Sequence, residues 1–243
     1  MDPKFVLLKI IEVNKVKKKS SDISIIIRTK NEARWIGHCI QSLVDNFDQP
    51  ELIIIDDNSK DETIEIIKSF EKDFNLKGTD PRYTKILFES IQNYTPGLSL
   101  NKGVSMATNN IVLIISAHCV ISKVDLEKTK KNLNNYVAVY GNQIPVYNGK
   151  RINKRYVWSN FGPNSKENFY CDQEQRYFLH NAFAFYKKEI LQKFPFDNNL
   201  IAKEDRYWAN DIINNKKFSI FYDSEQSVYH HYTVNGATWK GIG

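Results

Sequence analysis

The chain has 243 residues, of which 42% are hydrophobic and 26% charged, values ordinary for a globular protein with a sizeable core. Its net charge of +6 is concentrated at the start, where six lysines and two acidic residues within residues 1–19 contribute +4, so no basic stripe is expected on the folded body and a nucleic-acid partner is not expected. No apolar run approaches the ~20 residues needed to cross a bilayer.

Residues 1–21 form a basic N-terminal segment ahead of the predicted domain. Within it, residues 4–13 suit a short strand or an amphipathic helix equally well, and residues 15–22 are a polar linker. The lysines could contact an acidic membrane surface or could simply be solvated, and the solvated interpretation is favoured.

The body of the chain alternates strand and helix signals. Apolar runs predict strands at 23–28 and 52–55, and apolar spacing predicts helices at 33–46 and 61–74. This order predicts an α/β fold with a mostly parallel central sheet flanked by helices. Later patterns predict strands at 86–90, 111–116, 137–146, 182–186 and 218–222, and helices within 97–107, 122–135, 187–193 and 205–214. Residues 147–179 show little periodicity, as a substrate-facing loop region would.

The strand at 52–55 ends directly in two carboxylates, Asp56 and Asp57. A continuous apolar run suits a strand buried on both faces of a parallel sheet, and ligands of such sheets bind just beyond the carboxyl ends of the strands. The polar residues after the first strand should meet the aspartates at this edge: Thr29, Asn31 and Glu32. Together they could hold a base and a ribose, whereas the alternative is turn and helix-cap chemistry.

Two further positions are weak signals when taken singly. Asn101 lies in the segment 97–103, which is too poor in glycine for a phosphate-binding loop. His118 follows the buried strand at 111–116 and is placed to bind a ligand or metal, although a lone histidine is more often structural.

The last cluster lies near the end of the chain. Glu204 and Asp205 are adjacent carboxylates at a predicted helix start, where one could act as a general base. The alternative is the acidic first turn that many helices carry. His230 and His231 come about 25 residues later, near a predicted strand end.

In this order the segments resemble the family 2 glycosyltransferases, which have the GT-A fold. The matching pieces are residues 24–32, 54–63, 97–103 and 203–205, and the likeness spans roughly residues 22–232. The resemblance implies a GT-A domain at 22–243, with a Rossmann-like nucleotide-sugar-binding half at 22–121 and an acceptor-binding, catalytic half at 122–243.

The resemblance implies an inverting transfer of a sugar from a nucleotide-sugar donor to an acceptor hydroxyl. It assigns the general base to Asp205, with Glu204 as the fallback. It assigns nucleoside and donor binding to Thr29, Asn31, Glu32, Asp56, Asp57 and Asn101.

One departure concerns the metal. The family commonly carries Asp-x-Asp where this chain has Ser116-Ala117-His118, so His118 would keep only the second ligand position. His230 or His231 matches a further ligand in some relatives. The implied cofactor is a divalent cation, Mn²⁺ or Mg²⁺, with neutral imidazoles suiting Mn²⁺ better, and the metal being dispensable is left open.

The finer expectation is a bacterial rhamnosyltransferase-like member that builds surface polysaccharide on a glycan or lipid-linked acceptor. Three cysteines without metal-ligand spacing indicate a cytoplasmic location, with peripheral membrane contact through the basic N-terminus left open. A non-catalytic nucleotide-sugar-binding or scaffold protein is the alternative, because the metal motif is altered. A sugar nucleotidyltransferase is disfavoured, because no glycine-rich loop follows the first strand. The sequence carries no signal for an oligomeric state or for a natural end at Gly243.

Overall fold

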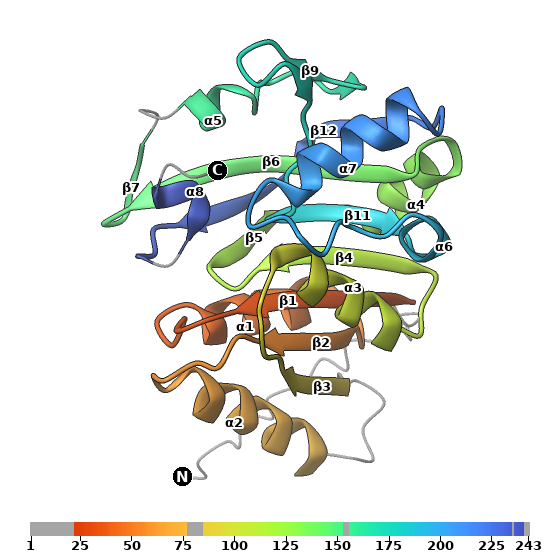
Figure 1. Cartoon of the computed structure of the whole chain (residues 1–243). Coiled ribbons are helices and arrows are strands. Elements are labelled where there is room, and N and C mark those ends of the chain that lie inside the picture. The colour runs from red at the N-terminus through yellow and green to blue at the C-terminus, as the bar shows by residue number, and fades with distance from the viewer. Residues whose placement is uncertain (1–21, 77–84, 153–155, 235, 241–243) are drawn as a thin grey trace, which may run out of the picture.

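The computed structural model describes residues 22–76, 85–152, 156–234 and 236–240 (Figure 1). The basic segment 1–21, with the strand or helix expected at 4–13, lies outside the described residues.

One large sheet organises the molecule, in the strand order β3-β2-β1-β4-β11-β6-β12-β5. Its first half is parallel and consists of β1 (Ile23–Thr29), β2 (Glu51–Asp56), β3 (Lys85–Ser90) and β4 (Ile111–Ser116). β1, β2 and β4 are apolar and largely buried because helices cover both of their faces, which is the arrangement expected for a parallel sheet, whereas β3 is the partly exposed edge strand.

The second half of the sheet mixes directions. β11 (Phe183–Lys187) runs antiparallel between β4 and β6 (Ala138–Tyr147), β12 (Ile220–His231) runs parallel to β6, and β5 (Cys119–Lys123) runs antiparallel to β12. The result is the α/β fold with a mostly parallel central sheet that the sequence predicts.

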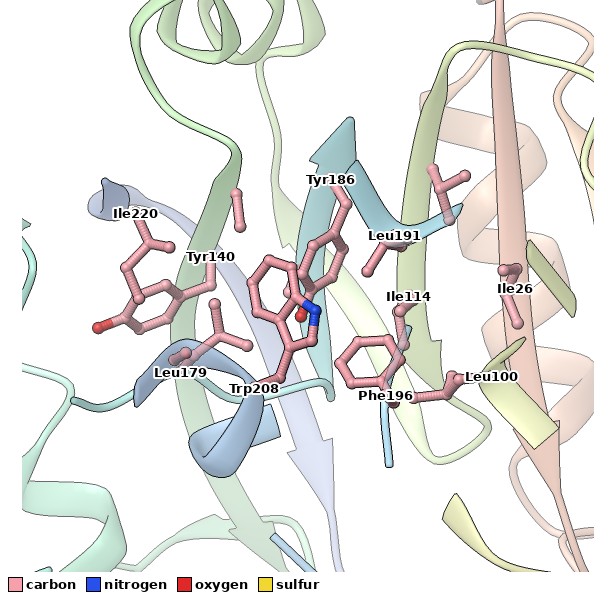
Figure 2. Packing of buried hydrophobic residues seen from close by; sticks show 14 of the residues in the cluster. Ile26, Leu100, Ile114, Tyr140, Leu179, Tyr186, Leu191, Phe196, Trp208 and Ile220 are labelled. Atoms are coloured by element: carbon pink, nitrogen blue, oxygen red, sulfur yellow. The ribbon is translucent and has the colours of Figure 1, made fainter. Parts of the chain in front are cut away.

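Helices cover both faces of this sheet, and two apolar cores result. In Figure 1, α3 (Pro96–Met106) crosses in front of the sheet, whereas α1 (Ile36–Asn46) lies behind it. The core on the α3 side also contains residues of α6 (Lys188–Lys193) and α7 (Glu204–Asn214), and Figure 2 shows Trp208 packed near Tyr186 and Phe196 within it. The core on the α1 side contains residues of α2 (Thr63–Leu76) and α4 (Leu126–Asn135).

The remaining elements are short and lie mostly in the region without sequence periodicity. They are β7 (Lys150–Arg151), α5 (Tyr156–Ser159), β8 (Lys166–Glu167), β9 (Tyr170–Cys171), β10 (Arg176–Tyr177) and, near the end of the chain, α8 (Ala237–Lys240).

Two elements expected from the sequence are present with different bounds. The helix expected at 122–135 starts only at Leu126, because the preceding residues form β5 and Asp125 caps the helix by accepting from the Lys128 N–H. The strand expected at 218–222 is the long β12, which continues to His231. Its pairing with β6 shifts register between Asp223 and Ser227, and this irregularity interrupts the apolar pattern that a straight strand would show.

Candidate active site

The ends of several strands meet at one edge of the sheet. Thr29 is in register with Asp56, and Arg28 is in register with Ser116, so β1, β2 and β4 end together. β11 runs the opposite way, and therefore the residues just before it, His180 and Asn181, arrive at the same edge.

A cavity of about 230 Å³ opens at this edge. Among its lining residues are most of those predicted from sequence: Thr29, Glu32, Asp57, His118, Glu204, Asp205 and His230. The cavity thus joins the end of the first strand, the Asp-Asp turn, the histidine after β4 and the acidic pair.

The acidic pair is buried and held by specific partners. α7 begins at Glu204, which places both carboxylates at its N-terminus, where the helix dipole favours negative charge. Glu204 Oε1 accepts from Arg28 Nη1 at 3.0 Å and from Asn181 Nδ2 at 3.2 Å. Asp205 Oδ2 accepts from the Asn181 backbone N–H at 2.9 Å, and Asp205 Oδ1 accepts from the Arg206 backbone N–H at 2.9 Å.

The two carboxylates differ in their electrostatics. Burial raises the pKa of Glu204 above its ordinary value, although the Arg28 guanidinium opposes this shift. Burial also disfavours the charged form of Asp205, but the Arg206 guanidinium and the Asn181 N–H outweigh it and lower the pKa of Asp205. Asp205 is therefore a carboxylate at neutral pH, which a general base has to be.

The wall formed by the first strand presents polar atoms that the described residues leave without a partner. Thr29 Oγ1 and Glu32 Oε2 are buried and have no hydrogen-bond partner among the described residues. Asp57 also faces the cavity, and its Oδ2 accepts from Lys30 Nζ at 2.6 Å. Buried polar groups are normally paired, so these atoms are available to a polar ligand.

Three predicted residues lie behind this wall and do not line the cavity. Asp56 is fully buried and accepts from the Ser59 backbone N–H at 2.9 Å, which closes the turn after β2. Asn31 Oδ1 accepts from the Lys60 backbone N–H at 2.7 Å. Asn101 donates from Nδ2 to the Phe196 carbonyl at 2.8 Å. Each of these side chains holds a loop at the edge of the site.

Two histidines contact each other in the lining of the cavity. His118 Nε2 lies 3.0 Å from His230 Nε2, His118 Nδ1 lies 3.1 Å from Glu32 Oε1, and His230 Nδ1 lies 2.8 Å from Gln143 Oε1. A carboxylate can only accept, so Glu32 keeps the proton on His118 Nδ1 and leaves His118 Nε2 with a lone pair. Gln143 Oε1 also accepts and keeps the single proton of His230 on Nδ1, so the Nε2 atoms of both histidines present lone pairs, and a cation or a shared proton between them satisfies this geometry.

His231 does not join this pair. Its ring stacks on Trp35 with centroids 4.0 Å apart, and it lines a small separate hollow with Arg34. Successive residues of a strand point to opposite sides, so His230 and His231 cannot both face the cavity from β12.

The histidine pair fits a metal in part. Two nitrogens bound at right angles to one metal, each about 2.1 Å from it, are about 3.0 Å apart. Among the described residues, however, no group of three or more His, Cys, Asp and Glu side chains could hold a metal ion. A cation here would therefore need oxygen ligands from a bound substrate.

Sequence reasoning did not assign a role to four residues that line the cavity: Arg28, His180, Asn181 and Arg206. The available signal was the polar pair His180-Asn181 immediately before an apolar strand, which becomes informative once that strand is known to be antiparallel. His180 is buried and its pKa is lowered to about 3, by burial first and then by the Arg206 charge.

Comparisons with known proteins bear on the family and the fold of the chain. The family model described as "Glycosyl transferase family 2" matches residues 24–194. A Campylobacter jejuni protein named "GalNAc(5)-diNAcBac-PP-undecaprenol beta-1,3-glucosyltransferase" is 24% identical over 205 residues, which are 82% of this chain and 62% of that protein.

Solved structures with the same fold include S. aureus TarS 1-349 in complex with UDP-GlcNAc, with a TM-score of 0.64, 18% identity, and coverage of 88% of this chain and 59% of that one. The mannosyltransferase PcManGT from Pyrobaculum calidifontis, in complex with GDP-Man and Mn²⁺, has a TM-score of 0.65 at 16% identity, covering 92% of this chain and 61% of that one. The chain thus spans about three-fifths of the length of each of these three proteins. Across the described part of the chain, no helix has the length and apolar character needed to cross a membrane.

Proposed function

The chain belongs to glycosyl transferase family 2 and has the GT-A fold, and from this premise we propose that it transfers a sugar from a nucleotide-sugar donor to an acceptor hydroxyl. The observation that carries the proposal is the buried pair Glu204 and Asp205. It shares one cavity with polar atoms of Thr29 and Glu32 that have no hydrogen-bond partner in the described part of the chain. A base and a polar ligand wall in one cavity are what such a transfer needs.

The chemical step assigns the general base to Asp205. As the acceptor oxygen attacks the anomeric carbon, Asp205 takes the proton of the acceptor hydroxyl. The new carbon–oxygen bond forms on the face opposite the leaving group, and the nucleoside diphosphate leaves with the electron pair of the broken bond. The transfer therefore inverts the anomeric centre. Glu204, held by Arg28, is the fallback for the base.

The donor nucleoside lies against Thr29, Glu32 and Asp57 in this proposal. Asp57 can accept from a base N–H or a ribose hydroxyl, and Lys30 can move with it because its side chain is 55% exposed. Asp56, Asn31 and Asn101 support this binding indirectly by fixing the loops on which the wall is built.

A divalent cation fits the same proposal through His118 and His230. It would neutralise charge on the diphosphate leaving group. Glu32 fixes the tautomer of His118, and two neutral imidazoles favour Mn²⁺ over Mg²⁺. His231 lies outside this ligand pair, because its ring stacks on Trp35 and lines a separate hollow.

The acceptor in this proposal is a glycan or a lipid-linked glycan of a bacterial surface polysaccharide. The supporting observation is the similarity to a relative whose name specifies an undecaprenol-linked substrate. The same similarity supports our proposal that the enzyme works in the cytoplasm, at the inner face of the membrane. The rhamnosyltransferase-like subgroup stays a prediction.

The test is sugar transfer and donor hydrolysis across a panel of nucleotide sugars, with Mn²⁺ or with EDTA. Asp205→Asn should lower kcat by about 10²–10⁴-fold, because the acceptor loses its proton acceptor, while the donor KM stays near wild type. Glu204→Gln is the matched variant, and full activity in Asp205→Asn with loss in Glu204→Gln would reassign the base.

Two binding measurements complete the test. Mn²⁺ titration by calorimetry, with a nucleoside diphosphate present to supply the oxygen ligands, should lose its signal in His118→Ala and keep it in His231→Ala, and the reverse result would reject the ligand pair. A protein whose melting temperature rises with a nucleotide sugar, yet which turns over no donor with any acceptor, would be the scaffold alternative.

A further inference from the structure

Arg206, the residue after the acidic pair, is buried in a chain of charges. Only 2% of Arg206 and 8% of Glu174 are exposed. Arg206 Nε lies 3.1 Å from Glu174 Oε1 and 3.0 Å from Glu174 Oε2, and Arg206 Nη1 lies 3.1 Å from Asp205 Oδ1. The guanidinium also lies 4.8 Å from the centre of the Phe178 ring, which shields it from water. Glu174, Arg206 and Asp205 therefore form one buried ionic chain.

Glu174 reaches this chain from a part of the sequence that gave no structural signal. It lies in the turn between β9 and β10, where its backbone N–H donates to the Cys171 carbonyl at 3.1 Å. The turn thus brings a carboxylate from 32 positions earlier in the chain onto the first turn of α7.

The ionic chain of Glu174, Arg206 and Asp205 determines how the Asp205 carboxylate is oriented. Asp205 Oδ1 takes two donors, both from Arg206, and Oδ2 takes the Asn181 backbone N–H. Both lone pairs of Oδ1 are therefore occupied. Oδ2 accepts one hydrogen bond and still has a free lone pair. Oδ2 is the atom left to accept a proton from an acceptor hydroxyl.

We propose that Glu174 is a positioning residue for the general base: it holds Arg206 so that Arg206 orients Asp205 with Oδ2 available to the acceptor. The inference rests on the proposed function and adds a residue far from the acidic pair in sequence. Glu174 also balances the charge of Arg206, so that Asp205 keeps enough basicity to take a proton.

Removing the negative charge of Glu174 and removing the positive charge of Arg206 should shift the pKa of Asp205 in opposite directions. Without the Glu174 carboxylate, the Arg206 charge acts more strongly on Asp205 and the pKa of Asp205 falls. Without the Arg206 charge, the largest influence that lowers the pKa of Asp205 is lost and this pKa rises. The other titratable or charged groups that act on Asp205 or belong to this network are Arg28, Glu204, His180, Tyr186 and Lys203.

The experiment measures kcat and donor KM against pH for Glu174→Gln, Arg206→Met and Arg206→Lys. In Glu174→Gln we expect kcat to fall about tenfold and its acidic limb to move down by about one pH unit, with donor KM unchanged. In Arg206→Met the acidic limb should move up by about one unit, and Arg206→Lys, which keeps the charge, should leave it near wild type.

The matched control is Glu167→Gln, because Glu167 lies on the nearby strand β8 and bonds Ser219 and Tyr136 rather than the cavity. Its pH profile should equal that of the wild type. Circular dichroism checks that each variant folds. If Glu174→Gln does not fold, Glu174→Asp replaces it. Because Glu174→Asp keeps the negative charge, we expect its kcat to fall while the acidic limb stays in place.

If the acidic limb of the kcat–pH profile stays in place in both Glu174→Gln and Arg206→Met, the inference is overturned. The ionic chain would then have only a structural role. A wild-type protein that turns over no donor would instead overturn the proposed function, and that result is independent of the variants.

Discussion

Arg28 illustrates how one buried cation sets the charge state of a site. Its Nη1 lies 3.0 Å from Glu204 Oε1, and only 16% of the Arg28 side chain and 6% of the Glu204 side chain are exposed. Burial raises the pKa of Glu204, and the Arg28 cation opposes this rise and so favours the charged carboxylate.

Replacing Arg28 by Met should therefore destabilise the fold by an amount that depends on pH. At pH 8 the uncompensated Glu204 carboxylate should cost about 3 kcal/mol of unfolding free energy. At pH 5 the cost should be smaller, because the penalty from a carboxyl whose folded pKa lies above its unfolded value grows as pH rises. Urea unfolding at the two pH values measures the difference. The double variant Arg28→Met, Glu204→Gln should show no such difference, and an equal cost at both pH values in the single variant would refute this account.

At the scale of elements, the segment 97–103 shows how a weak sequence signal can have a clear structural cause. A Cβ on Gly97 would lie 2.1 Å from the Asp197 carbonyl oxygen, and one on Gly103 would lie 2.6 Å from Ile26 Cγ2. Asn101 on the same helix bonds the Phe196 backbone. The segment is thus a packing surface of α3, which holds the loop before α7 on one side and β1 on the other.

Gly97→Ala should be destabilising because the obstruction is backbone and cannot move aside like a side-chain end. We expect a loss of about 2–3 kcal/mol, measured by urea unfolding, together with a lower kcat because the loop leads into Glu204 and Asp205. Gly162→Ala is the matched control, since nothing lies within 4 Å of a Cβ built there and its stability should be close to wild type. Equal stability of the two variants would contradict the packing argument.

The elements also show what the sequence could predict and what it could not. The parallel strands were predictable because their apolar runs end in polar residues such as Thr29 and Asp57 at one edge. The contribution of His180 and Asn181 was not, because it depends on β11 being inserted antiparallel between β4 and β6, a pairing with no local signal. Glu174 was also beyond prediction, since its turn joins two strands of two residues each.

At the scale of the whole molecule, burial of the site has a consequence for stability. The cavity edge collects groups from both halves of the sheet, and His180 lies among them, buried and neutral. Its Nδ1 accepts from the Ala182 backbone N–H at 3.2 Å, so the proton is on Nε2, 3.3 Å from Thr238 Oγ1. Both ring nitrogens are thus engaged, and a further proton would cost the contact with the Ala182 N–H.

The pKa of His180 is lowered from 6.5 to about 3, and this predicts that stability falls in acid. Between these two values the unfolded chain binds a proton that the folded chain does not, so stability is fully present above pH 6.5 and is lost as pH falls toward 3. This group alone should remove up to about 1.4 kcal/mol per pH unit within that window.

The measurement is urea unfolding from pH 7 to pH 4 for the wild type, His180→Asn and His38→Asn. His180→Asn should be less stable at pH 7, because it loses the buried ring, but should show a shallower fall of stability with acid. His38 is exposed, and His38→Asn should keep the wild-type slope. If His180→Asn keeps the full wild-type slope, the acid sensitivity arises elsewhere. That result would refute the account in which burial and the Arg206 charge keep His180 neutral.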